Sequence, residues 1–202
     1  MSSSETGMVE LVVLCDATGA AIGTRPKAAV HTSDTPLHLA FSCYVFDREG
    51  RLLVTRRAQD KATFPGVWSN SFCGHPAPDE EVFEAVRRRA GQELGLLLED
   101  LRLVLPRFRY QATMDNGVRE NELCPVFTAR ATGDPLPDPA EVADVVWVPW
   151  RQFRDEVRAG RREVSSWCAL QVSELAELEE ADGTFPQAST TDLPAAARPG
   201  PR

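Results

Sequence analysis

Short apolar runs separated by turn residues dominate the pattern of this chain. Runs rich in β-branched and aromatic residues, bounded by Gly, Pro, Asn or Asp, are typical of β-strands. The turn residues at 47–50 and 115–117 each lie between two such runs, which predicts two β-hairpins. The predicted strands cover residues 9–15, 20–24, 37–46, 51–57, 71–75, 101–110, 119–130 and 144–149.

Three segments have the spacing of an amphipathic helix instead. Within residues 79–94 the apolar positions recur every three or four residues, which places them on one helix face. Acidic residues occupy the expected first turn, where the helix dipole favours negative charge, and Gly95 is placed to end the helix. Residues 150–160 and 165–180 predict two further helices. Hairpins combined with these helices favour an α+β fold over a repeated βαβ sheet.

The length of 202 residues fits one domain, and neither a repeat nor a linker interrupts the chain between its ends. Residues 1–7 are polar and are predicted to form a flexible N-terminus. Residues 184–202 are rich in Pro, Ala, Ser and Thr, which predicts a disordered tail. The predicted domain therefore spans residues 8–183.

The composition excludes several classes of protein. The net charge is -8, from 22 Lys and Arg against 30 Asp and Glu, so a nucleic-acid partner is not expected. No apolar run reaches the ~20 residues that a membrane span needs, and the start of the chain lacks the pattern of a signal peptide. Because the five cysteines show no paired spacing, we expect a cytoplasmic protein with free thiols.

The three histidines and a pair of carboxylates are candidate metal ligands. His31 and His38 flank a polar loop before a predicted strand, and His75 lies in the segment SFCGHP. Glu120 and Glu122 are two residues apart in a predicted strand, so both lie on one face of it. Such a set suits Mn, Fe, Zn or Mg. The spacing alone leaves open the alternative that these side chains bind no metal, because it does not show which segments are close in space.

Residues 74–96 resemble the Nudix box, G-x5-E-x7-R-E-U-x-E-E-x-G-U, in which U is apolar. Two acidic positions differ, because Arg89 replaces the Glu after the Arg and Gln92 replaces the first Glu of the pair. The box brings carboxylates to metal ions on a diphosphate, so Glu93 remains as the main metal carboxylate. These differences disfavour hydrolysis and are compatible with the fold serving other chemistry. The matching positions are Gly74, Glu80, Arg88, Glu93, Gly95 and Leu96.

The similarity extends beyond the box, and the chain resembles type 1 isopentenyl-diphosphate delta-isomerase. The resemblance runs in order from about residue 24 to residue 150, with a weaker match at residues 165–171. It implies a single-domain, Nudix-like α+β fold with mixed and antiparallel sheets flanked by helices. The segments that carry it are AAVHTSDTPLHLAFS, LLVTRRAQDK, FPGVWSNSFCGHP, FRYQAT and ENELCPVF, of which NSFCGHP and ENELCPV are the most specific.

The resemblance also implies a role for each matching residue. Cys73 matches the catalytic thiol, Glu122 the catalytic carboxylate and Tyr110 the tyrosine beside it. Trp167 matches the aromatic residue that covers the substrate. The ligands of a Mn²⁺ or Mg²⁺ site, with Zn²⁺ as a further candidate, match His31, His38, His75, Glu120 and Glu122. Glu93 matches the carboxylate that joins a Mg²⁺ on the diphosphate. The basic residues that hold the diphosphate match Lys27, Arg57, Lys61 and Arg89.

The implied activity is the isomerisation of isopentenyl diphosphate to dimethylallyl diphosphate in isoprenoid biosynthesis. One proton is added to the alkene and another is removed from the neighbouring carbon, through a carbocation-like intermediate. Whether Cys73 or the Glu122–Tyr110 pair donates the proton stays open. The alternatives are a Nudix hydrolase of a diphosphate substrate and a binding module without activity. The expected partner is a small allylic or homoallylic diphosphate, and the expected assembly is a monomer or weak homodimer.

Overall fold

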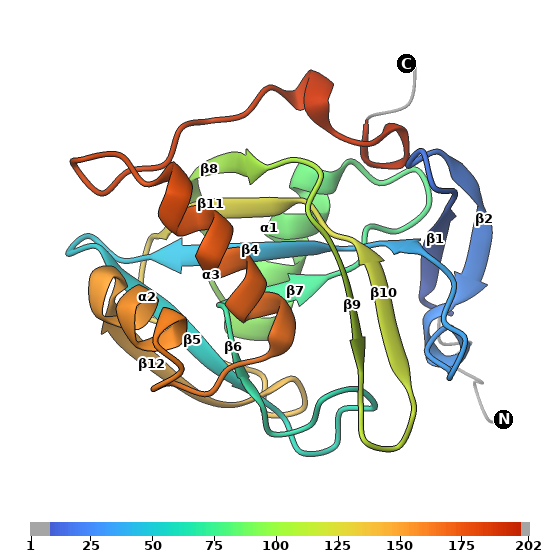
Figure 1. The fold of residues 1–202 in the computed structure, drawn as a ribbon, viewed down its shortest axis with the longest axis horizontal. Coiled ribbons are helices and arrows are strands. Elements are labelled where there is room, and N and C mark those ends of the chain that lie inside the picture. The colour runs from blue at the N-terminus through green and yellow to red at the C-terminus, as the bar shows by residue number, and fades with distance from the viewer. Residues whose placement is uncertain (1–8, 199–202) are drawn as a thin grey trace, which may run out of the picture.

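Two β-sheets carry most of the chain in the computed structural model, which describes residues 9–198 (Figure 1). The larger sheet runs in the order β12 (Val142–Pro149), β5 (Arg51–Arg57), β4 (Phe41–Phe46), β11 (Val126–Ala131) and β8 (Leu98–Leu105). The short strands β6 (Trp68–Ser69) and β7 (Phe72–Gly74) pair with β5 and β4. The smaller sheet runs β2 (Ala21–Pro26), β1 (Leu11–Cys15), β3 (His38–Leu39), β10 (Arg119–Leu123) and β9 (Arg109–Thr113). Each sheet contains one parallel pair among antiparallel ones, so the prediction of mixed sheets is confirmed.

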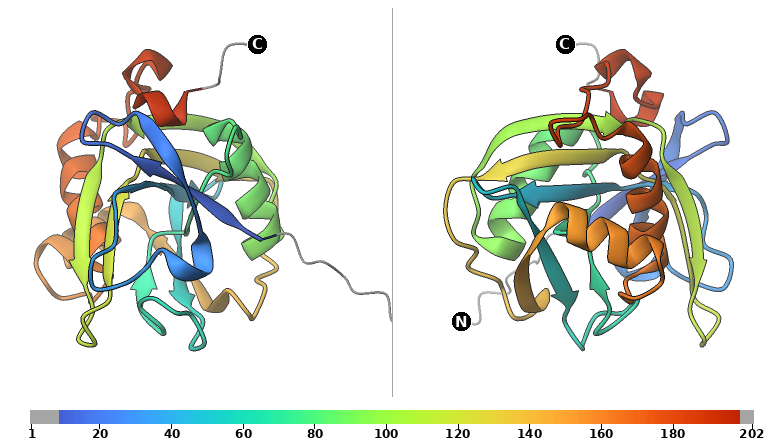
Figure 2. Two further views of the ribbon diagram at one scale, coloured as in Figure 1. Left: turned by 90° about the vertical axis from the view of Figure 1, so that its right-hand side faces the viewer. Right: turned by 60° about the vertical axis from the view of Figure 1, so that its left-hand side comes forward.

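Helices cover both faces of the larger sheet. Helix α1 (Val82–Leu94) lies on one side, and α2 (Trp150–Arg158) and α3 (Ser166–Leu178) lie on the other (Figure 2). Strand β4 is buried on both faces, because alternate side chains enter two separate cores. Phe41 and Cys43 pack in the core that α1 shares, and Tyr44 packs in the core of α2 and α3.

Three predicted strands are each divided between the two sheets. Residues 37–46 form β3 and then β4, residues 101–110 form β8 and the start of β9, and residues 119–130 form β10 and then β11. At the last corner Cys124–Pro125 leaves the smaller sheet, and the Pro125 carbonyl accepts a hydrogen bond from the Ser42 amide at 3.0 Å. A proline has no amide hydrogen for a continuous ladder, which favours this change of sheet.

Helix α1 begins later than its apolar pattern indicates. Asp79 has a φ of 63°, in the left-handed region, and Glu81 is the extended residue that precedes the helix. The acidic residues 79–81 therefore lie before the first turn rather than inside it. At the other end the prediction is confirmed, since Gly95 has a φ of 61° and its amide hydrogen bonds to the carbonyls of Ala90 and Gly91.

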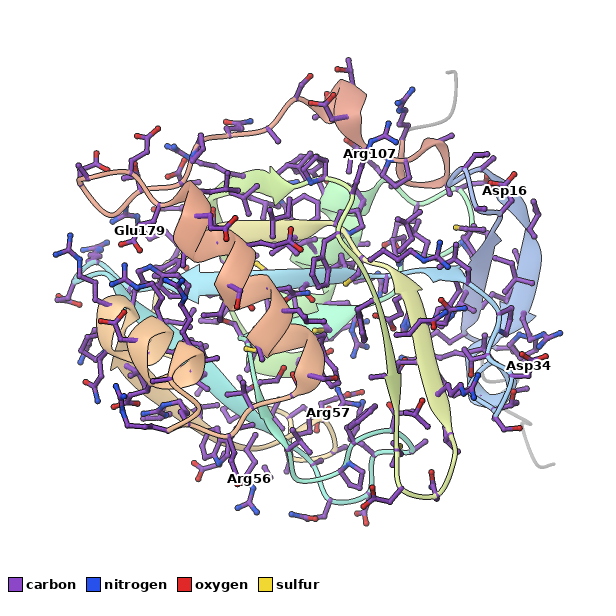
Figure 3. The ribbon with its side chains drawn as sticks, viewed as in Figure 1. Asp16, Asp34, Arg56, Arg57, Arg107 and Glu179 are labelled. Atoms are coloured by element: carbon purple, nitrogen blue, oxygen red, sulfur yellow. The ribbon has the colours of Figure 1, made fainter. Side chains whose placement is uncertain are left out.

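The structure differs from the predicted disordered tail over residues 184–198. These residues run past the edge strand β8 of the larger sheet, where the Ala188 amide donates to the Leu103 carbonyl at 2.8 Å. They continue through η2 (Thr190–Asp192) and η3 (Ala195–Ala197) to the turn of the β1–β2 hairpin, where the Ala196 amide donates to the Gly19 carbonyl at 2.9 Å. Arg107 also reaches this segment (Figure 3) and donates to the Asp192 carbonyl at 2.9 Å. The composition misleads here because a few spaced apolar side chains, Leu193 among them, are enough to dock the segment.

The predicted N-terminal segment 1–7 and the last residues of the predicted tail, 199–202, lie outside the described residues. The prediction for their structure therefore stays a prediction. Within residues 9–198, every helix is too short or too polar to cross a membrane.

Candidate active site

A pocket of about 590 Å³ is lined by residues of both sheets and of helices α1 and α3. It gathers almost all residues that the sequence singles out, although they come from positions far apart in the chain. Those that line the pocket are Lys27, His31, Arg57, Lys61, Cys73, His75, Arg89, Glu93, Tyr110, Glu120, Glu122 and Trp167. His38 lies beneath them and is fully buried.

Strand pairing brings the histidines and carboxylates together. His38 in β3 lies directly opposite Glu122 in the parallel strand β10, and His75 follows the last residue of β7. Side-chain atoms of the three histidines and Glu122 all lie within 4.8 Å of one another. Glu120 lies on the same face of β10 as Glu122, and its Oε2 is 3.0 Å from Nε2 of His31.

Four buried atoms of this cluster have no hydrogen-bond partner among the described residues: Nε2 of His31, Nε2 of His38, Nδ1 of His75 and Oε2 of Glu120. Nδ1 of His38 lies 2.9 Å from the carbonyl oxygen of Pro36, which orients the lone pair of Nε2 toward the cluster. Buried acceptors that face one another without donors are costly unless a cation lies among them. The set of imidazoles and carboxylates therefore fits a divalent metal site.

Glu122 is the most strongly perturbed carboxylate of the site. Burial by itself raises its pKa, but the neighbouring imidazoles of His38 and His75 outweigh burial and hold the pKa well below its usual range. The hydroxyl of Tyr110 donates to Glu122 Oε2 at 2.8 Å, and Nε2 of His75 lies 3.1 Å from Oε1. Burial raises the pKa of Tyr110 well above its ordinary value, so its hydroxyl stays a donor.

Cys73 is partly buried, whereas the other four cysteines are buried, and it borders the pocket. Its thiol donates to Asn70 Oδ1 at 3.4 Å, and its Sγ lies 3.2 Å from Ser42 Oγ. Burial raises the pKa of Cys73 to about 11, so the group is a neutral thiol near pH 7. The other four thiols, Cys15, Cys43, Cys124 and Cys168, are buried in the cores, as expected for packing residues.

Trp167 forms an aromatic wall of the pocket. Ser165 caps helix α3 by accepting a hydrogen bond from the Cys168 amide, and this cap places Trp167 in the first turn of the helix. The indole lies 5.7 Å from the ring of Tyr110 and 5.2 Å from that of Phe64, between centroids. The guanidinium carbon of Arg57, labelled in Figure 3, is 5.8 Å from the indole centroid.

Lys27, Lys61 and Arg89 lie close together in the pocket, where carboxylates balance their charge. Lys27 donates to Glu10 at 3.0 Å, and Lys61 forms an ion pair with Glu141. Arg89 is paired with Glu93 and lies 3.5 Å from Glu141. Glu10 and Glu141 were not predicted, because nothing in their local sequence distinguishes them from surface carboxylates.

Two residues of the Nudix-like box, Glu80 and Gly74, have structural roles here. Glu80 accepts two hydrogen bonds from Arg88 at 2.7 Å, which ties the loop before α1 to the helix. Gly74 allows a close approach, since an added Cβ would lie 2.8 Å from Phe41 Cζ and 2.9 Å from Arg89 Cγ. The box therefore holds Arg89 and the segment of His75 in place.

Comparison with known proteins supports this fold and identifies relatives of the chain. A family model for the NUDIX domain matches residues 36–168. A Saccharopolyspora erythraea protein named isopentenyl-diphosphate Delta-isomerase is 56% identical over 189 residues, covering 94% of this chain and 97% of that protein. A Clavibacter sepedonicus protein of the same name is 61% identical over 163 residues, covering 81% and 86%.

Solved structures with a similar fold are more distant in sequence. A crystal structure from Deinococcus radiodurans aligns with a TM-score of 0.62 at 20% identity, covering 82% of this chain and 98% of that one. A MutT NUDIX hydrolase from Burkholderia pseudomallei aligns with a TM-score of 0.53 at 22% identity, covering 69% and 98%. At these identities the likeness establishes the fold and nothing about the reaction.

Proposed function

The chain belongs to the isopentenyl-diphosphate Delta-isomerase family and carries a Nudix domain, and from this membership we propose that the pocket is its isomerase active site. The reaction converts isopentenyl diphosphate to dimethylallyl diphosphate by moving the double bond by one carbon. One observation carries the assignment to this pocket: a thiol and a tyrosine-bound carboxylate share a cavity with an aromatic wall and a cationic end.

The cationic end takes the diphosphate. Lys27, Lys61 and Arg89 supply the positive charge there, and Arg57, which lies beside the Trp167 indole, adds a further cation that lines the same pocket. Arg89 Nε is buried and has no hydrogen-bond partner among the described residues, so it is available to a phosphate oxygen. Glu93, which pairs with Arg89, would join the Mg²⁺ that accompanies the diphosphate.

The apolar end carries out the two proton transfers. The Cys73 thiol gives its proton to the terminal methylene carbon, and the alkene electrons form the new C–H bond while the electron pair of the S–H bond stays on sulfur. The Glu122 carboxylate then removes a proton from the neighbouring methylene, whose C–H electrons form the new double bond. A proton returns from Glu122 to the sulfur before the next turnover, so the protons balance.

Tyr110 and the metal cluster orient the base. The hydrogen bond from Tyr110 holds one carboxylate oxygen of Glu122, so the other can face the substrate. His31, His38, His75 and Glu122, with Glu120 beside His31, would hold a divalent cation, which would supply a fixed positive charge that balances the buried carboxylates. We propose Mn²⁺ or Mg²⁺, with Zn²⁺ as a further candidate.

The aromatic wall stabilises the intermediate. The positive charge develops on the tertiary carbon, next to the indole of Trp167, and a desolvated cation over an aromatic face gains about 2 kcal/mol or more. Trp167 and Tyr110 also exclude water, which would otherwise trap the cation as an alcohol.

Hydrolysis of a diphosphate is the less favoured function. The box carries Arg89 and Gln92 where a hydrolase box has carboxylates, and Arg89 is instead paired with Glu93. The relatives named above are isomerases by name, at high identity over most of the chain.

The test is an assay of the purified protein with isopentenyl diphosphate and Mg²⁺, followed by proton NMR and a phosphate assay. We expect dimethylallyl diphosphate to form without release of phosphate or diphosphate. Metal-dependent phosphate release without isomerisation would overturn the proposal in favour of hydrolysis.

The remaining features of the protein are proposed with this function. We propose a cytoplasmic enzyme that acts on a small diphosphate as a monomer or weak homodimer, without a nucleic-acid partner. Light scattering of the purified protein over a concentration series measures the assembly directly.

A further inference from the structure

One buried amide links two residues that the proposed mechanism uses separately. Asn70 is fully buried, and its Oδ1 accepts hydrogen bonds from Trp167 Nε1 at 3.2 Å and from the Cys73 thiol at 3.4 Å. The hydroxyl of Ser69 donates to the same oxygen at 2.8 Å. Cys73 comes from β7 and Trp167 from α3, so this oxygen is the common point through which the thiol and the indole are held.

The nitrogen of the same amide determines which way the oxygen points. Asn70 Nδ2 donates to the carbonyl of Phe72 at 2.8 Å and to that of Cys43 at 3.1 Å. A flipped amide would place its oxygen against two carbonyl oxygens and its NH₂ group against three donors. Because buried polar groups without partners are costly, only the observed orientation satisfies the whole group.

A second series of hydrogen bonds reaches the sulfur of Cys73 from α3. The Tyr44 hydroxyl donates to Gln171 Oε1 at 3.0 Å, and Gln171 Nε2 donates to Ser42 Oγ at 2.9 Å. The Ser42 oxygen lies 3.2 Å from the sulfur of Cys73 and 3.4 Å from that of Cys124. The Ser42 hydrogen is therefore directed to a sulfur, where it can stabilise the thiolate left after proton transfer.

We propose that Asn70, with the support of Ser42, is a positioning residue that holds the Cys73 thiol and the Trp167 indole in one arrangement around the alkene. The inference rests on the proposed function. Before reaction the S–H group points to Asn70 Oδ1, and it rotates to the alkene while the sulfur stays in place. As the proton leaves, the electron pair remains on sulfur and accepts the hydrogen bond from Ser42. Asn70 and Ser42 exchange no proton with the substrate.

The test compares kcat and KM of Asn70→Ala and Asn70→Ser with those of the wild type, using isopentenyl diphosphate and Mg²⁺. We expect kcat to fall about 100-fold, the loss that a misplacement of about 1 Å causes. KM should stay within about threefold, because the described hydrogen bonds of Asn70 include none to the cationic residues that bind the diphosphate.

A matched control is the next residue along the chain. Ser71 is fully buried as well, donates to the Leu53 carbonyl at 2.6 Å and accepts from the Val45 amide at 2.7 Å. Its described hydrogen bonds reach neither the thiol nor the indole. Ser71→Ala should lower the thermal stability and leave kcat unchanged.

The indole N–H supplies a spectroscopic readout. In ¹⁵N-labelled protein the Trp167 indole hydrogen should exchange with solvent faster in the Asn70 variants than in the wild type. In Ser71→Ala its exchange should be unchanged, because the bond from Trp167 to Asn70 is intact there.

The outcomes separate this inference from the proposed function. A wild-type protein without isomerase activity would refute the function itself. An active wild type with folded Asn70 variants that keep their kcat, or that lose activity through KM alone, would overturn the positioning role. If neither Asn70 variant folds, Ser42→Ala is the test: kcat should fall by about tenfold or more, and an unchanged kcat would overturn the proposal.

Discussion

Truncation of one side chain in the C-terminal segment tests whether that segment is part of the folded domain. Leu193 is 1% exposed and packs in the core shared by α1 and the larger sheet. In Leu193→Ala the folded state loses the buried leucine surface and gains a cavity. Such truncations cost about 2–5 kcal/mol in well-packed cores.

We expect Leu193→Ala to lie at the low end of this range, about 2–3 kcal/mol. The segment is near the end of the chain and its backbone can settle into the space left by the leucine. For a protein of this size a loss of 1 kcal/mol lowers Tm by about 2–4 °C, so Tm should fall by roughly 5–10 °C. Urea unfolding followed by circular dichroism measures the free energy of unfolding, and a thermal scan measures Tm.

The control is Leu170→Ala on helix α3, where the leucine is 50% exposed. That variant should change the free energy of unfolding by less than about 0.5 kcal/mol. If Leu193→Ala were as stable as Leu170→Ala, the segment would not be docked in solution. The prediction of a disordered tail, made from composition, would then be right over residues 184–198 as well.

Three further predictions concern the site and the helix beside it. Cys73→Ala should stay folded and lose at least about a thousandfold in kcat. The control Cys43→Ala, at a fully buried position, should have a lower Tm and keep its activity. Normal turnover by Cys73→Ala would exclude the thiol as the acid. Elemental analysis after dialysis should find less divalent metal in His75→Ala than in wild type. The wild type should also release its metal as the pH falls below about 6, because imidazoles must be neutral to bind a metal. Equal metal content in both proteins would argue against the site. Burial raises the pKa of Glu80, but the hydrogen bond from Arg88 outweighs burial and lowers the pKa below its ordinary value. The ionised Glu80 therefore stabilises the folded protein fully above pH ~4.3, and this contribution is lost as the pH falls through the lowered pKa. Glu80→Gln should therefore be less stable than wild type by up to about 1 kcal/mol at pH 7, and a difference that persists at pH 2 would refute this linkage.

Features that depend on neighbours along the chain could be predicted from the sequence. Strand β5 has the predicted bounds, because its alternation and the turn at 47–50 are local signals. The glycine that ends α1 is likewise set by local geometry, since a left-handed residue after an apolar helical stripe favours Gly. The shared face of Glu120 and Glu122 follows from the two-residue period of a strand.

The convergence of the site was decided by tertiary structure. Nothing in the local sequence pairs His38 with Glu122 across β3 and β10, or brings Lys27 and Trp167 to one pocket. The resemblance to a known family supplied those residues as expectations, but it supplied no contacts. It gave no role to Asn70, whose importance lies in five side-chain hydrogen bonds, two of them with Cys43 and Trp167, which are far from it in the sequence.

The same division explains two differences between the sequence-based prediction and the structure. Strands such as 119–130 read as continuous because hydrophobic alternation does not record which sheet a residue joins, and Pro125 marks a corner that only the second sheet requires. The segment 184–198 has only two large apolar side chains, Phe185 and Leu193, yet Leu193 packs in a core built from distant parts of the chain. Local spacing determines which face of an element is apolar, whereas the surface that covers this face depends on contacts between residues far apart in sequence.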